Sequence, residues 1–106
     1  MPSPSVTELR RTYAGEMLLA TGIESDPRLL EAFATVPREA FLGDPPWLLG
    51  GAGFGAIPST RDPRDIYRDV LVALDPLRGI NNGSPVLHAA ALHALAVKPG
   101  ETIVHI

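Results

Sequence analysis

The stretch of this sequence best suited to chemistry is a polar turn that runs directly into an apolar helix. Residues 79–85 read GINNGSP, and the residues up to position 97 are almost wholly Ala, Leu, Val and His. The Asn-Asn-Gly run tolerates positive φ, Ser84 can cap a helix, and Pro85 suits its first position. These roles explain each residue type without a ligand. Exposed amides and Asn side chains at a helix start would equally suit a ligand pocket, so both interpretations stay open.

Three histidines are candidates for metal binding or proton transfer. His88 and His93 are five residues apart, and at about 100° per residue they point about 140° apart around a helix. A zinc-binding pair on one helix face prefers four-residue spacing, and no third ligand is evident, so we predict no metal site. His105 lies in a predicted terminal strand, where we expect it to be packed rather than reactive.

A glycine-rich run, GGAGFG, places Gly51, Gly53 and Gly55 at alternate positions. Such glycines let a backbone approach a cofactor closely when a strand precedes them and a helix follows. Here PPWLL precedes the run and Ala-Ile-Pro follows it, which provides neither element. The run therefore predicts a flexible loop rather than a cofactor-binding turn.

Composition limits the class of protein. The chain has 106 residues, 45% of them hydrophobic, and a net charge of −3, which fits one small globular domain. No basic cluster favours nucleic acid, and the absence of cysteine excludes disulfides and thiolate chemistry. No signal peptide is visible, and no apolar run is long enough to span a bilayer. We expect a soluble, cytoplasmic protein.

The elements that must position these residues begin with two helices. Residues 5–20 have the capping-box spacing of Ser5 and Glu8 and an apolar stripe at three- and four-residue intervals. Asp26 and Pro27 open a second predicted helix that ends near Thr35, and REAFL, residues 38–42, adds a further turn.

The rest of the chain predicts a loop, two strands and a helix. Residues 43–64 hold five Gly and four Pro, which predicts a long loop, anchored by packing of Trp47. Residues 66–74 have a β-branched, apolar centre and predict a strand. A helix is expected from Pro85 to about residue 97, followed by a buried strand over residues 101–106.

Several of these segments, taken in order, resemble the N-terminal part of protein-L-isoaspartate O-methyltransferases. DPRLLEAFATVPREAFL is similar to the second helix of that family and its Val-Pro-Arg and Phe pattern. IYRDVLVAL stands where the family has a Tyr-x-Asp segment. GINNGSPVLHAAALHALAVKPGETIVHI is similar to the family's Gly-Gln-Thr-Ile-Ser-x-Pro loop, the next helix and a Lys-Pro-Gly turn into the first strand of the cofactor domain. The resemblance covers most of residues 5–106, and residues 43–64 have no counterpart.

The resemblance implies an α/β fold: an N-terminal helical segment plus the first elements of a Rossmann-like methyltransferase domain, truncated. Residues 1–106 would form one partial domain, with a helical part over 5–42, a Gly/Pro-rich loop over 43–64 and the start of the methyltransferase core over 65–106. The implied cofactor is S-adenosylmethionine, and the implied activity is methylation of isoaspartyl carboxylates in damaged proteins.

The residues that the resemblance assigns to cofactor and substrate contact lie in the same turn and helix. Ile80, Asn81, Asn82 and Gly83 fall where the family's loop contacts cofactor and substrate, and His88 falls where some members have a His near the cofactor. We expect these five residues to bind the cofactor. The family's loop Ser corresponds to Gly83, and Ser84, one position later, is the nearest candidate for its role. This departure raises the hypothesis of a related methyltransferase with another acceptor.

A second departure concerns the cofactor loop, since the chain ends at Ile106, just before the family's Gly-x-Gly turn. We therefore expect the chain alone to be an incomplete, inactive catalyst whose partner is a peptide or protein with isoaspartyl residues. The alternatives are a non-catalytic module that binds a peptide or partner chain, and a homodimer formed through the terminal strand, whose unpaired edge would be exposed.

Overall fold

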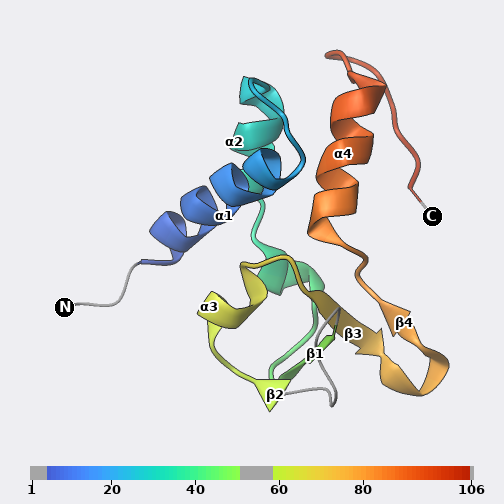
Figure 1. Ribbon diagram of the computed structural model, residues 1–106. Coiled ribbons are helices and arrows are strands. Elements are labelled where there is room, and N and C mark those ends of the chain that lie inside the picture. Colours follow the sequence, from blue (N-terminus) through green and yellow to red (C-terminus); the bar gives the residue numbers. More distant parts are fainter. Residues whose placement is uncertain (1–4, 51–58, 106) are drawn as a thin grey trace.

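The computed structural model describes residues 5–50 and 59–105 as a mixed arrangement of helices and a small antiparallel sheet (Figure 1). The helices are α1 (Val6–Ala20), α2 (Pro27–Thr35), α3 (Pro63–Ile66) and α4 (Pro85–Leu95), with 3₁₀ turns at Arg38–Phe41 and Pro76–Arg78. The strands are β1 (Trp47–Gly50), β2 (Ser59–Thr60), β3 (Leu71–Asp75) and β4 (Ile80–Asn81). The broad prediction of an α/β protein is thus confirmed.

The N-terminal helices start where their capping residues predict. Ser5 Oγ accepts a hydrogen bond from the Glu8 amide at 3.1 Å, and the Glu8 carboxylate accepts one from the Ser5 amide at 3.2 Å. Asp26 accepts from the Leu29 amide at 3.2 Å. These contacts satisfy amide groups that have no partner within the helix. The predicted extra turn after α2 is also present, as the 3₁₀ turn Arg38–Phe41.

The predicted long loop over residues 43–64 is wrong for the part that the structure describes. Trp47 and Leu49 are buried and alternate with two half-buried residues to form β1, which pairs with both β2 and β3. The alternation of buried and half-buried residues was missed in the sequence because it is short and Gly and Pro residues surround it. The predicted packing of Trp47 is confirmed, and its indole N–H donates to the Gly43 carbonyl at 3.1 Å. The GGAGFG run lies almost wholly within residues 51–58, which are outside the described residues.

The predicted strand over residues 66–74 starts too early. Asp62 accepts from the Arg64 amide at 2.9 Å and caps the short helix α3, so Ile66 is the last residue of a helix. The strand β3 begins only at Leu71. An Asp-Pro pair is a strong helix start, and it outweighs the β-branched composition that follows.

The predicted terminal strand is wrong for residues 101–105. Helix α4 ends at Leu95, and Ala96 adopts a left-handed conformation with φ of 49°. Residues 101–105 have no regular structure and are exposed. A strand needs a neighbouring strand to receive its backbone hydrogen bonds, and the sheet that the structure describes ends at β2 and β4. The edge on which the homodimer hypothesis rested is therefore absent from these residues.

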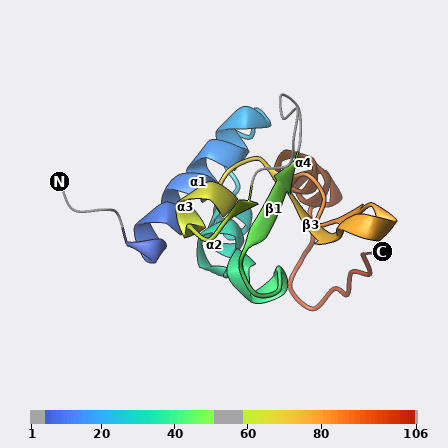
Figure 2. The same cartoon turned by 90° about the horizontal axis from the view of Figure 1, so that it is seen from below.

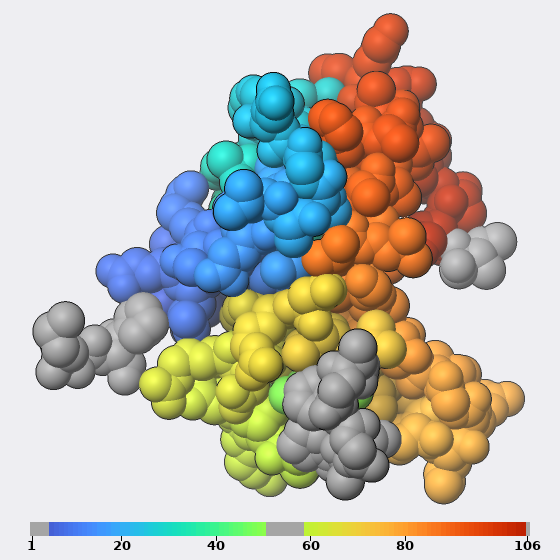
Figure 3. All heavy atoms as spheres, in the orientation of Figure 1, coloured from blue at the N-terminus to red at the C-terminus, as the bar shows by residue number. Residues whose placement is uncertain are grey.

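The sheet has the order β2-β1-β3-β4, with every described pair antiparallel. Helices α1 and α2 pack together and lie beside α4, and the strands form a second layer below them (Figures 1 and 3). Seen from below, β1 and β3 lie across these helices (Figure 2). The core fills the space between the layers and joins Tyr13 and Met17 of α1 to residues such as Trp47, Ile66 and Val72. None of the helices within residues 5–50 and 59–105 is long and apolar enough to cross a membrane.

The hydroxyl group of Tyr67 joins three segments that are far apart in the sequence. It accepts hydrogen bonds from Arg10 Nε at 2.9 Å and from the Arg38 amide at 3.1 Å, and it donates to Glu39. Arg10 and Glu39 also form an ion pair. Burial and the hydrogen bond to Glu39 raise the pKa of Tyr67, so the hydroxyl keeps its proton at neutral pH. Helix α1 and the 3₁₀ turn are therefore held at the end of α3.

Replacing Tyr67 with Phe tests this connection. We expect Tyr67→Phe to lower the free energy of unfolding by about 1–3 kcal/mol, because partly buried donors lose their acceptor. The matched control is Tyr13→Phe, since Tyr13 is equally buried and its hydroxyl has no hydrogen-bond partner among residues 5–50 and 59–105. We expect a loss below about 1 kcal/mol for this control. Urea denaturation measures both. Equal losses in the two variants would contradict the role of the Tyr67 hydroxyl.

Candidate functional site

The turn before α4 is built by its two asparagines. The Asn82 amide donates to the Val72 carbonyl at 3.0 Å, and the Asn82 side-chain oxygen accepts from the Val72 amide at 2.7 Å. The Asn81 side chain accepts from the Gly83 amide at 2.8 Å. Ser84 then caps α4 by accepting from the Leu87 amide at 3.3 Å. The interpretation of this turn as a capped helix start is confirmed.

Gly83 is required by close packing as well as by backbone conformation. Its φ is +79°, and a Cβ atom at this position would lie 2.6 Å from Nε2 of His88. The imidazole of His88 therefore occupies the space that a side chain at position 83 would need. The backbone of the turn and the ring one helical turn later form a single packed unit.

A cavity of about 420 Å³ lies beside this unit, between α2, α4 and the C-terminal segment. Most of its wall is apolar and includes Phe33, Leu92 and Ile103. Its polar lining residues are Tyr13, Arg38, Asn82, His88 and His105. This volume and this composition are typical of small-molecule sites, which are mainly apolar with a few polar groups that orient the ligand.

Arg38 is the strongest charge in the cavity wall. Its Nη1 donates to the Ile66 carbonyl and to the Arg68 carbonyl, the latter at 3.1 Å, and its guanidinium carbon lies 5.3 Å from the ring centroid of Tyr13. Within the described part of the chain, no carboxylate forms a salt bridge with Arg38 and no group accepts from its Nε or Nη2. Burial lowers the pKa of Arg38, but a guanidinium stays charged at neutral pH.

His88 and His105 add two imidazoles near Arg38. Their ring centroids are 5.2 Å apart at an interplanar angle of 81°. Burial lowers the pKa of His88, with smaller contributions from His105 and Arg38. None of the described residues that line the cavity is acidic. The cavity therefore has an electropositive end and an apolar remainder.

The structure brings together only part of the set that the resemblance assigns to ligand contact. Asn82 and His88 line the cavity, and Gly83 supports His88. Ile80 and Asn81 are exposed in β4 and do not line the cavity. Ser84 uses its hydroxyl as a helix cap and as a donor to Asp69 at 3.3 Å.

Sequence reasoning missed Arg38 and Tyr13 as site residues. The available signal was the isolated cation of the Val-Pro-Arg pattern, at the end of an apolar helix. That pattern cannot show that Arg38 comes to line one cavity with residues of a helix fifty positions away.

The other two histidines, His93 and His105, lie in different surroundings from His88. His93 contacts the Asp26 carboxylate at 2.8 Å, away from His88, and this hydrogen bond lowers the pKa of Asp26. His105 is exposed, although its ring meets that of His88, so the predicted packing is only partly realised. Within residues 5–50 and 59–105, no group of three or more His, Cys, Asp or Glu side chains is placed to hold a metal ion.

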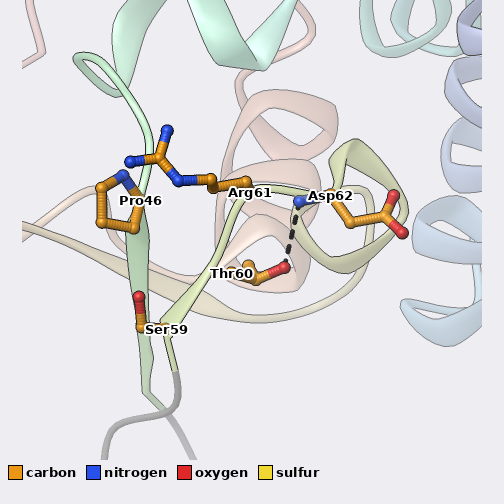
Figure 4. Close-up of a pocket in the computed structure, with 5 residues that line it drawn as sticks. All are labelled: Pro46, Ser59, Thr60, Arg61 and Asp62. Atoms are coloured by element: carbon orange, nitrogen blue, oxygen red, sulfur yellow. Dashed lines mark hydrogen bonds between the residues drawn. The ribbon is translucent and has the colours of Figure 1, made fainter.

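A second, more open depression of about 710 Å³ is lined by Pro46, Ser59, Thr60, Arg61 and Asp62 (Figure 4). Thr60 Oγ1 accepts from the Asp62 amide at 3.1 Å and donates to Asp65 at 2.5 Å. The Asp62 carboxylate points away from the other four residues and pairs with Arg64. Thr60 and Asp62 cap α3 and have their own partners, and the depression is more open than the cavity beside α4, so we place the candidate site in that cavity.

Comparison of the chain with models of protein families, with curated proteins and with solved structures found no match.

The contact between Gly83 and His88 can be tested by a mutant cycle. We expect Gly79→Ala, at a φ of +69° with open space around it, to cost about 1 kcal/mol from backbone strain alone. Gly83→Ala has the same strain plus the clash with His88, and we expect it to cost about 1–3 kcal/mol more.

In a His88→Ala background the clash disappears. The two glycine substitutions should then cost the same within about 0.5 kcal/mol, as measured by urea denaturation. A difference that persists without the imidazole would contradict the packing described above.

The lowered pKa of His88 predicts a pH dependence of stability. The unfolded chain binds a proton at His88 near the ordinary pKa of 6.5. The folded chain resists protonation because burial disfavours the charge, and His105 and Arg38 lower the pKa further. Stability is therefore lost as the pH falls below that value. We expect His88→Gln to reduce the loss of unfolding free energy between about pH 8 and about pH 5. Parallel pH profiles for the two proteins would contradict this assignment.

Proposed function

We propose that this chain is the acceptor-side part of an S-adenosylmethionine-dependent protein methyltransferase of the protein-L-isoaspartate O-methyltransferase type. Its N-terminal helices and the start of a Rossmann-like core would form the site for a damaged protein segment. The ordered resemblance of the sequence motivates the proposal. The observation that supports it best is that Asn82 and His88, both assigned to the site by that resemblance, line one cavity together with Arg38.

Methyl transfer requires little of the protein beyond the orientation of the two reactants. A carboxylate oxygen forms a bond to a methyl carbon while the bond from that carbon to sulfur breaks, and the sulfur keeps the electron pair. S-adenosylmethionine, when bound, supplies this electrophilic methyl group. An isoaspartyl carboxylate is already ionised at neutral pH, so no base has to remove a proton. The residues around the cavity have to bind the carboxylate, orient it and exclude water.

The charges of the cavity suit the methyl acceptor, a carboxylate, better than the methyl donor, a sulfonium cation. The Arg38 guanidinium attracts a carboxylate and repels a sulfonium cation, and the imidazoles of His88 and His105 can donate hydrogen bonds to a carboxylate. The described residues contain no Gly-rich turn between a strand and a helix, the usual support for a nucleotide. We therefore assign His88 and Asn82 to the acceptor side, and we expect this chain alone to bind S-adenosylmethionine weakly.

A second candidate function is that of a non-catalytic peptide-binding or partner-binding module. The antiparallel pairing of all described strands favours it, since a methyltransferase core of the Rossmann type has a mainly parallel sheet. The two candidates differ in their ligand preference, because a general peptide-binding module has no reason to distinguish isoaspartyl from aspartyl residues.

Isothermal titration with matched peptides tests the proposal. We expect an isoaspartyl peptide to bind at least about tenfold more tightly than the same peptide with a normal aspartyl residue, a difference of about 1.4 kcal/mol. Equal affinities would favour the binding module and contradict the methyltransferase proposal. Sub-micromolar affinity for S-adenosylmethionine would contradict the assignment of the cavity to the acceptor.

A further inference from the structure

The guanidinium of Arg38 is held in place by backbone groups and leaves one side available to a ligand. Nη1 is used by the carbonyls of Ile66 and Arg68, and the face of the group lies over Tyr13. Its Nε and Nη2 have no acceptor among the described residues. Guanidinium groups bind carboxylates through two parallel N–H donors, which is the geometry that such an arrangement offers.

The side chains around Arg38 indicate the chemical character of the rest of the ligand. Beyond the imidazoles of His88 and His105, the wall is formed by apolar side chains such as Phe33, Leu92 and Ile103. No acidic residue lines the described cavity, and Asp69 is the carboxylate that raises the pKa of Arg38 against the larger effect of burial. Asp69 is already engaged by the Ser84 hydroxyl and the Val86 amide.

From this arrangement we infer that the cavity is a binding site for a carboxylate carried on an apolar body, with Arg38 as the group that binds the carboxylate. The apolar part lies between α2 and α4, and Asn82 and His88 border the charged end. The identification of this carboxylate with a methyl acceptor rests on the proposed function, whereas the binding site itself does not.

The test uses small ligands and the unmodified chain. The probes are phenylpropionate, its neutral amide phenylpropionamide and the cation phenylpropylamine, which share one apolar body. We expect the carboxylate to bind at least about tenfold more tightly than the amide, and the amine to bind most weakly, as measured by isothermal titration calorimetry at neutral pH. Equal binding of the carboxylate and the amide, or no binding of either, would overturn the inference.

Substitution of Arg38 locates the effect. In Arg38→Gln the preference for the carboxylate over the amide should fall to about twofold or less, with amide affinity unchanged. The matched control is Arg78→Gln, which removes the same charge from an exposed side chain outside the cavity. A folded Arg38→Gln protein that keeps the full preference would overturn the inference.

A third variant, Ala91→Phe, keeps the inference testable if the Arg38→Gln protein does not fold. Ala91 lines the cavity from an exposed position on α4, so a larger side chain there fills the site without disturbing Arg38. It should weaken phenylpropionate and phenylpropionamide alike, and unchanged binding would place the ligands elsewhere and overturn the inference. None of these measurements requires S-adenosylmethionine or an isoaspartyl peptide. Loss of peptide selectivity with intact carboxylate preference would therefore remove the methyltransferase proposal alone.

Discussion

The candidate site depends on the hydrogen bonds that Tyr67 makes at the end of α3. Its hydroxyl fixes the backbone of Arg38 through the amide of that residue, while the carbonyl of its neighbour Ile66 receives the Arg38 side chain. A guanidinium on a free surface loop would be mobile and strongly hydrated. Here the same short segment determines both where Arg38 starts and where its charged group lies. The ring of Tyr67 also packs edge-on against Tyr13, which connects the hydrogen bonds to the core.

A second constraint acts from the opposite wall of the cavity. Because Gly83 has no side chain, His88 can lie against the backbone of the turn, and the turn is itself attached to β3 by two hydrogen bonds of Asn82. The sheet therefore sets the position of the imidazole, as α3 sets that of the guanidinium. A guanidinium and an imidazole from segments fifty residues apart therefore line the same cavity, and none of the described lining residues is acidic. The charge of Arg38 has no carboxylate partner among the described residues, and burying such a charge is costly unless an anion or water is present. For this reason we regard the cavity as a binding site rather than as packing.

The sequence predicted the parts of this fold that depend on local signals. Ser5 with Glu8, Asp26 with Pro27, and Ser84 with Pro85 all open helices as their side chains predict. The strands were harder to predict from the sequence, because a strand forms only where another strand pairs with it. The segment at residues 101–105 remains irregular because it pairs with neither edge of the described sheet. By contrast, Trp47–Gly50 becomes a strand despite its Gly- and Pro-rich surroundings because β3 pairs with it.

The same distinction explains what was predictable in the site. Asn82, Gly83 and His88 belong to one continuous stretch, so a single motif could indicate them together. Arg38 could not be included, because its role comes from contacts across the fold that no spacing in the sequence encodes. The most direct measurement is a crystal structure of the chain with phenylpropionate. Our account predicts carboxylate oxygens about 2.7–2.9 Å from the guanidinium nitrogens of Arg38, with the phenyl ring between α2 and α4. A ring bound in the cavity with its carboxylate directed into solvent, or a ligand bound elsewhere, would contradict it.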